Sequence, residues 1–124
     1  EHDPPKFGDF EAQRHWMEIT INLEAKNWYT NSKNNTKEYW PLDYPPMIGY
    51  HSFIFGKILE KILPESVKLI ESHGYENIKF KYIMRFFVLL SAILIFQVGV
   101  NLFCWFIFIQ KQKMKLKKIK YSFY

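Results

Sequence analysis

Residues 86–109 read FFVLLSAILIFQVGVNLFCWFIFI, a stretch of 24 residues without a formal charge. A helix of about 24 residues is roughly 36 Å long, whereas the hydrocarbon core of a bilayer is about 30 Å thick. A helix on the surface of a soluble core would carry polar residues along one face, and this stretch offers only Ser91, Gln97 and Asn101. We therefore predict a transmembrane helix over residues 81–110.

The charges on the two sides of this helix predict its orientation. Residues 1–80 hold twelve acids and nine bases, a net charge of −3, whereas residues 81–124 hold eight bases and no acid, a net charge of +8. Six of these bases are lysines that directly follow the apolar stretch. Basic flanks of membrane helices stay in the cytosol, so we expect residues 111–124 to be cytosolic and residues 1–80 to face the ER lumen or the cell exterior.

Composition excludes several other classes. The pI of about 9.2 is typical of nucleic-acid-binding proteins, but the positive charge lies beside an apolar segment, so a membrane surface is the expected partner and nucleic acid is not. With 48% apolar residues the chain is not disordered, and its single cysteine excludes an internal disulfide framework.

Within the predicted membrane helix, Gln97 and Asn101 share a helix face. This face either meets further helices or belongs to a single-pass anchor that tolerates polar residues.

The region before the membrane helix is predicted to contain short helices. Residues 10–23 are expected to form the first, with Asp9 as its N-cap and Glu11 in its first turn. Residues 27–39 are rich in asparagine and lysine and are predicted to form a polar loop. The prolines of residues 42–46 prevent a helix from running through that segment.

Two further short helices are expected nearer the membrane. Apolar residues recur at helical spacing between Phe55 and Leu63, and a second helix is predicted to begin at Pro64 and to end at Gly74. Because their apolar residues lie on one side, we expect these amphipathic helices to lie on the bilayer surface or on neighbouring helices. Packing against a protein core outside the chain explains the pattern equally well.

Asn34-Asn35-Thr36 is an N-glycosylation acceptor sequence. Modification of Asn34 agrees with the lumenal side predicted for residues 1–80. In a chain this rich in asparagine, however, the tripeptide also arises by chance.

The residues that could carry chemistry form an acidic and aromatic cluster. The sequence has no glycine-rich phosphate loop, no paired-histidine zinc motif and no nucleophile elbow. A carboxylate can act as a general base, aromatic rings stack on sugars, and arginine pairs with phosphate. On spacing alone, the N-cap role of Asp9 is the stronger interpretation. The cluster comprises Asp9, Glu11, Arg14, His15, Trp16, Glu18, Trp40, Asp43, Tyr44, Tyr50 and His51.

Two of these segments resemble a known family. Residues 8–20, GDFEAQRHWMEIT, closely resemble the first lumenal loop of the ER alpha-1,3-glucosyltransferases of N-glycan assembly. Residues 39–46, YWPLDYPP, followed by residues 50–52, YHS, resemble the next motif of the same family. A weaker third match joins residues 74–76 to residues 84–85, and all three occur in the family's order.

The resemblance implies a polytopic, all-helical C-type glycosyltransferase of the ER membrane. Such an enzyme transfers glucose from dolichyl-phosphate glucose to the dolichyl-diphosphate-linked oligosaccharide, with inversion. We expect this chain to be a fragment that is inactive alone, with the first lumenal loop and the second transmembrane helix. Residues 11–18 favour the enzyme that adds the first glucose over the paralogue that adds the second. A non-enzymatic single-pass ER protein with a lumenal partner-binding segment is the alternative from another class.

The same resemblance implies roles for the candidate residues. Asp9 becomes the expected general base, and Asp43 is the second catalytic candidate, although its side chain could equally fix the turn before the prolines. No cofactor and no metal site are expected. The candidates for binding the lipid phosphate or the sugar are Arg14, His15, Trp16 and Tyr44, of which the three helix residues could instead pack.

Overall fold

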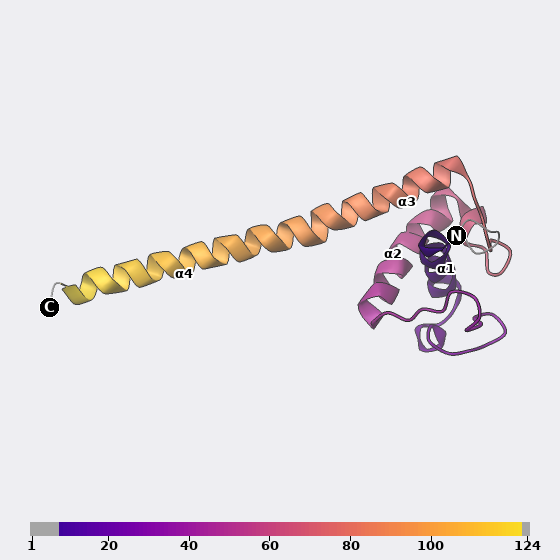
Figure 1. The fold of residues 1–124 in the computed structure, drawn as a ribbon, viewed down its shortest axis with the longest axis horizontal. Helices are drawn as coiled ribbons and strands as arrows, with labels where there is room; N and C mark the ends of the chain where they lie inside the picture. Colours follow the sequence, from indigo (N-terminus) through magenta and orange to yellow (C-terminus); the bar gives the residue numbers. More distant parts are fainter. Residues whose placement is uncertain (1–7, 123–124) are drawn as a thin grey trace. The chain divides into compact units, whose positions relative to one another are not determined.

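A computed structural model of the protein describes residues 8–122, with side chains for residues 8–115. The described residues form helices, turns and loops without a β-strand, so the predicted all-α fold is confirmed for them. They fall into two units, residues 8–81 and residues 82–122 (Figure 1). Each unit is described by itself.

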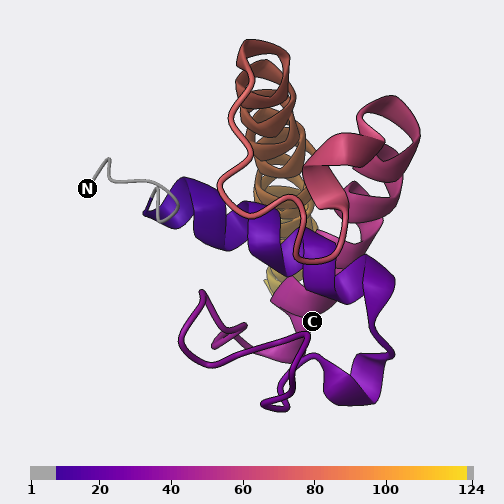
Figure 2. The same ribbon diagram turned by 90° about the vertical axis from the view of Figure 1, so that its right-hand side faces the viewer.

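Two helices form the centre of the first unit. Helix α1 (Asp9–Asn22) packs against α2 (Pro46–Ile62), and both views show them side by side (Figures 1 and 2). The helices meet at Gly56, where an added Cβ would lie 2.6 Å from Ile21 Cγ2 and 2.9 Å from the carbonyl oxygen of Met17. Glycine is therefore required for this close approach.

The helix predicted near Phe55 begins nine residues earlier, because Pro46 occupies its first turn, where proline needs no backbone donor. The polar loop before it is confirmed, and it is held by specific hydrogen bonds. Trp28 Nε1 donates to the carbonyl of Leu23 at 3.1 Å, and Asn35 Nδ2 donates to the carbonyl of Trp28 at 2.9 Å. A short 3₁₀ turn, η1 (Ala25–Asn27), joins α1 to this loop.

The prediction of a helix from Pro64 to Gly74 is wrong, because the helix in the structure is much shorter. Pro64 does begin a helical turn, but the structure forms only a 3₁₀ helix, η2 (Pro64–Val67), followed by turns as far as Gly74. Ile70 has a positive φ of 68°, a conformation that no right-handed helix contains. Its N–H donates to Glu18 Oε1 of α1 at 2.6 Å, so a tertiary hydrogen bond replaces the local helix.

The described part of the second unit belongs to a long helix that begins at Ile78, four residues before the unit boundary. Helix α3 (Ile78–Ser91), the π-helix η3 (Ala92–Gln97) and α4 (Val98–Ser122) follow one another without a break. From Ile78 to Lys115 this helix is long and apolar enough to cross a membrane, with a window of mean hydropathy 2.3. Its apolar part covers the stretch in which the membrane helix was predicted.

The polar residues of this helix behave as their spacing predicts. Gln97 Nε2 donates to Asn101 Oδ1 at 3.1 Å, which confirms that the two amides share a face. In the predicted cytosolic segment, residues 123–124 and the side chains after Lys115 lie outside the described residues.

Candidate active site

Asp9 opens α1 with an exposed side chain. The prediction that it caps the helix is wrong, because the cap falls one residue earlier. Gly8 holds that position with φ 63° and ψ −149°, a conformation essentially reserved for glycine. The carbonyl of Gly8 accepts the N–H groups of Glu11 and Ala12, each at 3.1 Å. Asp9 makes no side-chain hydrogen bond to the described residues, so its carboxylate faces outward.

Trp16 links α1 to the proline-containing motif. Its Nε1 lies 3.2 Å from the carbonyl oxygen of Trp40 and 3.1 Å from that of Pro41, and its ring centroid lies 5.3 Å from that of Tyr44. Trp40 adopts a positive φ of 40°, which a residue other than glycine holds only where the surroundings impose it. The two segments that carry the family resemblance therefore lie against each other.

Asp43 lies in the proline-containing motif that Trp16 contacts, and its side chain is exposed. The alternative in which its carboxylate fixes the turn is wrong, because among the described residues Asp43 makes no side-chain hydrogen bond. The turn is held instead by Tyr29, whose hydroxyl donates to the carbonyl of Tyr44 at 3.0 Å. The ring of Tyr44 is exposed as well. The side chains of these two neighbouring residues are thus both exposed to solvent.

Arg14, in contrast, is completely buried. Its Nη2 lies 2.6 Å from Glu11 Oε1 and 2.7 Å from Glu18 Oε2, and its Nε donates to Glu11 at 2.8 Å. Its Nη1 donates to the carbonyl of Ser66 at 3.1 Å and to Ser72 Oγ at 2.6 Å. Every nitrogen of the guanidinium therefore has an acceptor inside the unit, and the side chain joins α1 to η2 and to the turns that follow it.

We call Glu11, Arg14 and Glu18 the buried ion network. Two carboxylates facing one guanidinium leave an excess negative charge in the interior, which is costly unless hydrogen-bond donors surround it. Neutral donors meet this need. The hydroxyl of Tyr39 and the N–H of Gly74 donate to Glu11 Oε1 at 2.8 and 3.2 Å, and Glu18 accepts the N–H of Ile70.

The buried ion network changes the pKa values of its members. Burial alone would raise the pKa of Glu18, but the hydrogen bond from His15 and the charge of Arg14 outweigh burial and lower it to about 2. For Arg14, burial acts against the charged form, and the two glutamates more than compensate and raise its pKa. Burial and the hydrogen bond to Glu11 raise the pKa of Tyr39. The hydroxyl of Tyr39, which donates to Glu11, thus stays protonated.

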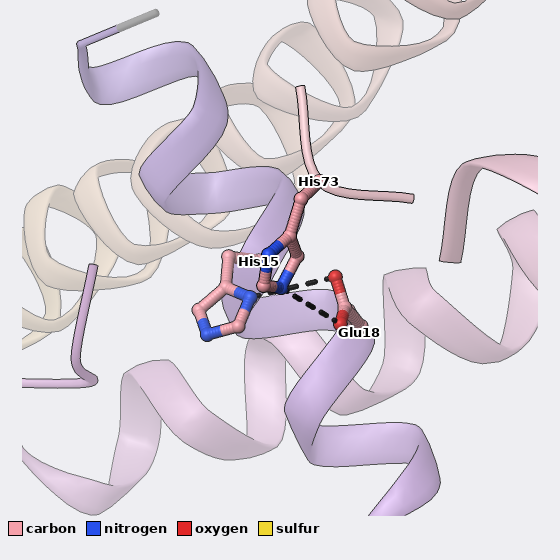
Figure 3. A group of neighbouring side chains, drawn as sticks. All are labelled: His15, Glu18 and His73. Carbon is pink, nitrogen blue, oxygen red and sulfur yellow. Dashed lines mark hydrogen bonds and ion pairs between the residues drawn. The ribbon is translucent and has the colours of Figure 1, made fainter. Parts of the chain in front are cut away.

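Two imidazoles flank Glu18 (Figure 3). His15 Nδ1 lies 3.4 Å from Glu18 Oε2, and His73 Nε2 lies 3.4 Å from Glu18 Oε1. His15 is buried on α1, whereas His73 comes from the turn after η2 and stacks on the ring of Tyr39 with centroids 3.9 Å apart. Burial lowers the pKa of His73. Like Arg14, His15 is enclosed by the fold in this structure.

His15, Glu18 and His73 also form a set of metal-ligand types that the sequence analysis did not expect, with ligand atoms within 4.8 Å of one another. Two histidines and one carboxylate suit a transition metal. However, the guanidinium of Arg14 already lies 2.7 Å from Glu18 Oε2, and like charges at such distances repel strongly in a buried site. The three residues are therefore better suited to the buried ion network than to binding a metal cation beside Arg14.

Sequence reasoning missed how these residues are joined. Glu11, Arg14 and Glu18 are three and four positions apart, a spacing that places them on one helix face and could have predicted the ion pairs. Nothing in the spacing indicates Ser72 or His73, which lie more than fifty residues along the chain. Only the turns after η2 bring them to α1.

Fold and sequence together define the class of protein. The chain is an all-α membrane protein in which an apolar helix follows a helical unit, and the carboxylates of Asp9 and Asp43 in that unit are exposed. Residues 4–123 match the ALG6, ALG8 glycosyltransferase family, and the chain belongs to this family. The sequence-based resemblance is thereby confirmed at the level of the family.

Curated relatives carry consistent names. The dolichyl pyrophosphate Man9GlcNAc2 alpha-1,3-glucosyltransferase of Rattus norvegicus is 49% identical over 102 residues, which are 82% of this chain and 20% of the relative. Proteins named as probable enzymes of this kind are 55% identical over 93 residues in Arabidopsis thaliana (75% of this chain, 17% of the relative) and 54% over 92 residues in Dictyostelium discoideum (74% and 18%). The chain spans about a fifth of the length of these relatives.

Proposed function

We propose that the protein containing these residues is a multi-pass enzyme of the ER membrane that transfers glucose from dolichyl-phosphate glucose to the terminal mannose of the dolichyl-diphosphate-linked oligosaccharide. The observation that carries the proposal is about 50% identity to alpha-1,3-glucosyltransferases over three quarters or more of the chain. The acceptor in the names of these relatives, Man9GlcNAc2, carries no glucose, which favours addition of the first glucose over the second. Residues 1–80 are proposed to face the lumen.

The proposed reaction is a single displacement with inversion. The mannose hydroxyl attacks the anomeric carbon of the β-linked glucose, the bond from that carbon to the phosphate oxygen breaks, and an α linkage forms. The hydroxyl proton passes to a carboxylate acting as general base. Dolichyl phosphate leaves as an anion that needs no further protonation. One base is therefore sufficient.

Asp9 is proposed as this base, because its carboxylate is exposed at the start of α1. Asp43 is proposed to orient the acceptor, since it is exposed in the segment that Trp16 holds against α1. Trp16 and Tyr44 supply aromatic surface for a sugar. Arg14 and His15 are assigned a positioning role instead of direct contact, because their side chains are buried. The remaining parts of the site are expected from the rest of the protein.

The test is Asp9→Asn in the full-length protein. Asp9 is exposed and makes no side-chain hydrogen bond to the part of the chain that the structure describes, so the variant should insert and accumulate normally. Transfer should fall by roughly 10² to 10⁴, the usual contribution of a general base. The assay measures glucose transfer from dolichyl-phosphate glucose to lipid-linked Man9GlcNAc2, and to the acceptor that already carries one glucose. Protein abundance is measured alongside.

Glu24→Gln is the matched control, because Glu24 is an exposed carboxylate of the same unit whose ion pair with Lys26 lies on the surface. It should transfer at the wild-type rate. An Asp9→Asn enzyme that keeps more than about a tenth of the activity would rule out this base. If Asp43→Asn is inactive beside an active Asp9→Asn, the base is Asp43.

A further inference from the structure

The backbone on either side of Asp43 is held by a tyrosine hydroxyl. Before Asp43, the hydroxyl of Tyr39 donates to Glu11 Oε1 at 2.8 Å, which joins this segment to α1. After Asp43, the hydroxyl of Tyr29 donates to the carbonyl of Tyr44 at 3.0 Å, which joins the segment to an earlier turn of the same loop. We call Tyr29 and Tyr39 the tyrosine clamp.

The ring of Tyr39 also has a defined place. It stacks on the imidazole of His73, with centroids 3.9 Å apart and planes at 12°, and it meets His15 in a T-shaped contact at 5.0 Å. Glu11, which accepts the hydroxyl, is completely buried in the ion network. A closely packed acceptor has little freedom to move. The position of Tyr39 relative to α1 is therefore set by its hydroxyl and by both imidazoles.

The backbone that follows Tyr39 is strained and held at several points. Trp40 has a positive φ of 40°, a conformation that persists in a residue other than glycine only where the surroundings impose it. The carbonyls of Trp40 and Pro41 both lie within 3.2 Å of Trp16 Nε1, and the side chain of Leu42 is buried in the hydrophobic core. Loss of an anchor would let this backbone relax and would move the carboxylate that comes next.

Asp43 itself contributes nothing to this arrangement. Its side chain is exposed and makes no hydrogen bond within the part of the chain that the structure describes. The fold thus fixes the residues around the carboxylate and leaves its two oxygens accessible. A polar group that is held in place without the use of its own oxygens is pre-organised to bind a ligand, and orientation of this kind contributes to catalysis.

We propose that Tyr39 and Tyr29 are positioning residues that hold Asp43 in the orientation in which it binds the terminal mannose of the acceptor oligosaccharide. They act through Asp43 and do not contact the substrate themselves. This inference rests on the proposed function, because it requires that Asp43 orients the acceptor.

The test uses single tyrosine-to-phenylalanine variants of the full-length protein, which remove one hydroxyl and keep the ring. Glucose transfer is measured in nanodiscs at varied concentrations of dolichyl-diphosphate-linked Man9GlcNAc2. Tyr39→Phe should raise the acceptor KM by about tenfold or more, since a misplacement of about 1 Å can cost roughly 10²-fold. Tyr29→Phe should act in the same direction but less strongly, because its hydrogen bond joins two neutral groups.

Tyr75→Phe is the matched control. The ring of Tyr75 packs on Phe80, and its hydroxyl makes no hydrogen bond to the described residues, so its KM and maximal rate should equal those of wild type. Limited proteolysis measures how much of each variant is folded. A purely structural role of the clamp would lower the maximal rate in proportion to the folded protein and leave the acceptor KM unchanged. That result in the two clamp variants would overturn the proposal.

A double-variant cycle shows whether Tyr39 acts through Asp43. The dissociation constant of the lipid-linked acceptor is measured for Tyr39→Phe, for Asp43→Asn and for the double variant, so that a variant without activity still gives a value. The double variant should bind the acceptor no more weakly than Asp43→Asn alone. Losses that multiply would mean that the two residues act independently, which would refute the positioning role. Failure of the proposed function has a different signature, because the wild-type protein would then transfer no glucose to this acceptor.

Discussion

At the scale of single residues, Arg14 shows how burial decides between two roles. In the sequence it lies beside aromatic and acidic residues, a setting that suits phosphate binding. In the structure each of its nitrogens already has an acceptor, and two of these acceptors are buried carboxylates. The guanidinium is therefore a structural centre that fixes α1, and with it the position of Asp9.

Arg14→Ala should destabilise the first unit by about 3–5 kcal/mol, because it leaves two buried carboxylates without their cation. Arg14→Lys should be intermediate, since one ammonium cannot reach all five acceptors. The measurement is limited proteolysis of the full-length protein under native conditions, which reports opening of the unit. Lys26→Ala, which removes an exposed ion pair, is the control and should not differ from wild type. Equal cleavage rates for Arg14→Ala and Lys26→Ala would contradict the structural role.

Acid should loosen the first unit in two steps. The pKa of His73 is lowered by burial, so its neutral form is favoured in the folded state and stability falls as the pH drops below about 6.5. The pKa of Glu18 is about 2 in the folded state, against an ordinary value of 4.5. Its stabilisation is complete above pH 4.5 and is lost between pH 4.5 and 2.

Thermal unfolding followed by tryptophan fluorescence across pH 7 to 3 tests this. Wild type should lose stability in both windows. Glu18→Gln should be less stable at pH 7 but should show a flatter profile below pH 4.5, because the group that titrates there is gone. A Glu18→Gln profile parallel to wild type below pH 4.5 would mean that another carboxylate carries the acid sensitivity.

At the scale of elements, local signals predicted some helices and not others. Helix α1 was predicted to within one residue because the acidic residues at its start are a local feature. The start of α2 was missed because the apolar periodicity was read only from Phe55, although Pro46 is a good first residue. The prediction of a helix that ends at Gly74 was wrong because Glu18, more than fifty residues earlier, accepts the N–H of Ile70. No local pattern contains that information.

Gly56→Ala should destabilise the packing of α1 on α2, although alanine favours a helix by about 1 kcal/mol over glycine. The new methyl group would lie 2.9 Å from the backbone oxygen of Met17, and overpacking of this kind costs about 1–3 kcal/mol. Faster proteolysis of the first unit is the expected readout. Glu60→Ala, on the exposed side of α2, controls for helix propensity and should have little effect. Stabilisation by Gly56→Ala would show that the helices separate easily.

At the scale of the whole molecule, the main prediction concerns the membrane sides. The exposed carboxylates Asp9 and Asp43 were found from motifs, but only the fold shows that Trp16 holds their two segments together. The lysines after the apolar helix predict that both carboxylates lie on the lumenal side of the membrane. In sealed microsomes, residues 1–80 should therefore resist added protease until detergent opens the vesicles. Digestion of residues 1–80 without detergent would show that the orientation is the opposite of the predicted one.

Asn34 gives an independent readout of the same orientation. It is exposed in the turn closed by Ser32 and Asn35, and Asn35 itself is buried. A glycan on Asn34 would therefore point into solvent, so endoglycosidase should increase the mobility of the full-length protein, and Asn34→Gln should remove that difference. Asn31→Gln, in the same loop but outside the acceptor sequence, should leave it unchanged. A shift that persists in Asn34→Gln would place the glycan elsewhere.

The π-helix η3 (Ala92–Gln97) in the long helix has a consequence for how sequences of this family are aligned. A π turn holds one residue more than an α turn, and each residue of an α-helix turns the chain by about 100°. The side chains of α4 therefore point about 100° away from the directions that a continuous α-helix would give them. A relative that lacks one residue between positions 92 and 97 could match residue for residue on both sides of the gap and still present a different stripe of α4 to its surroundings.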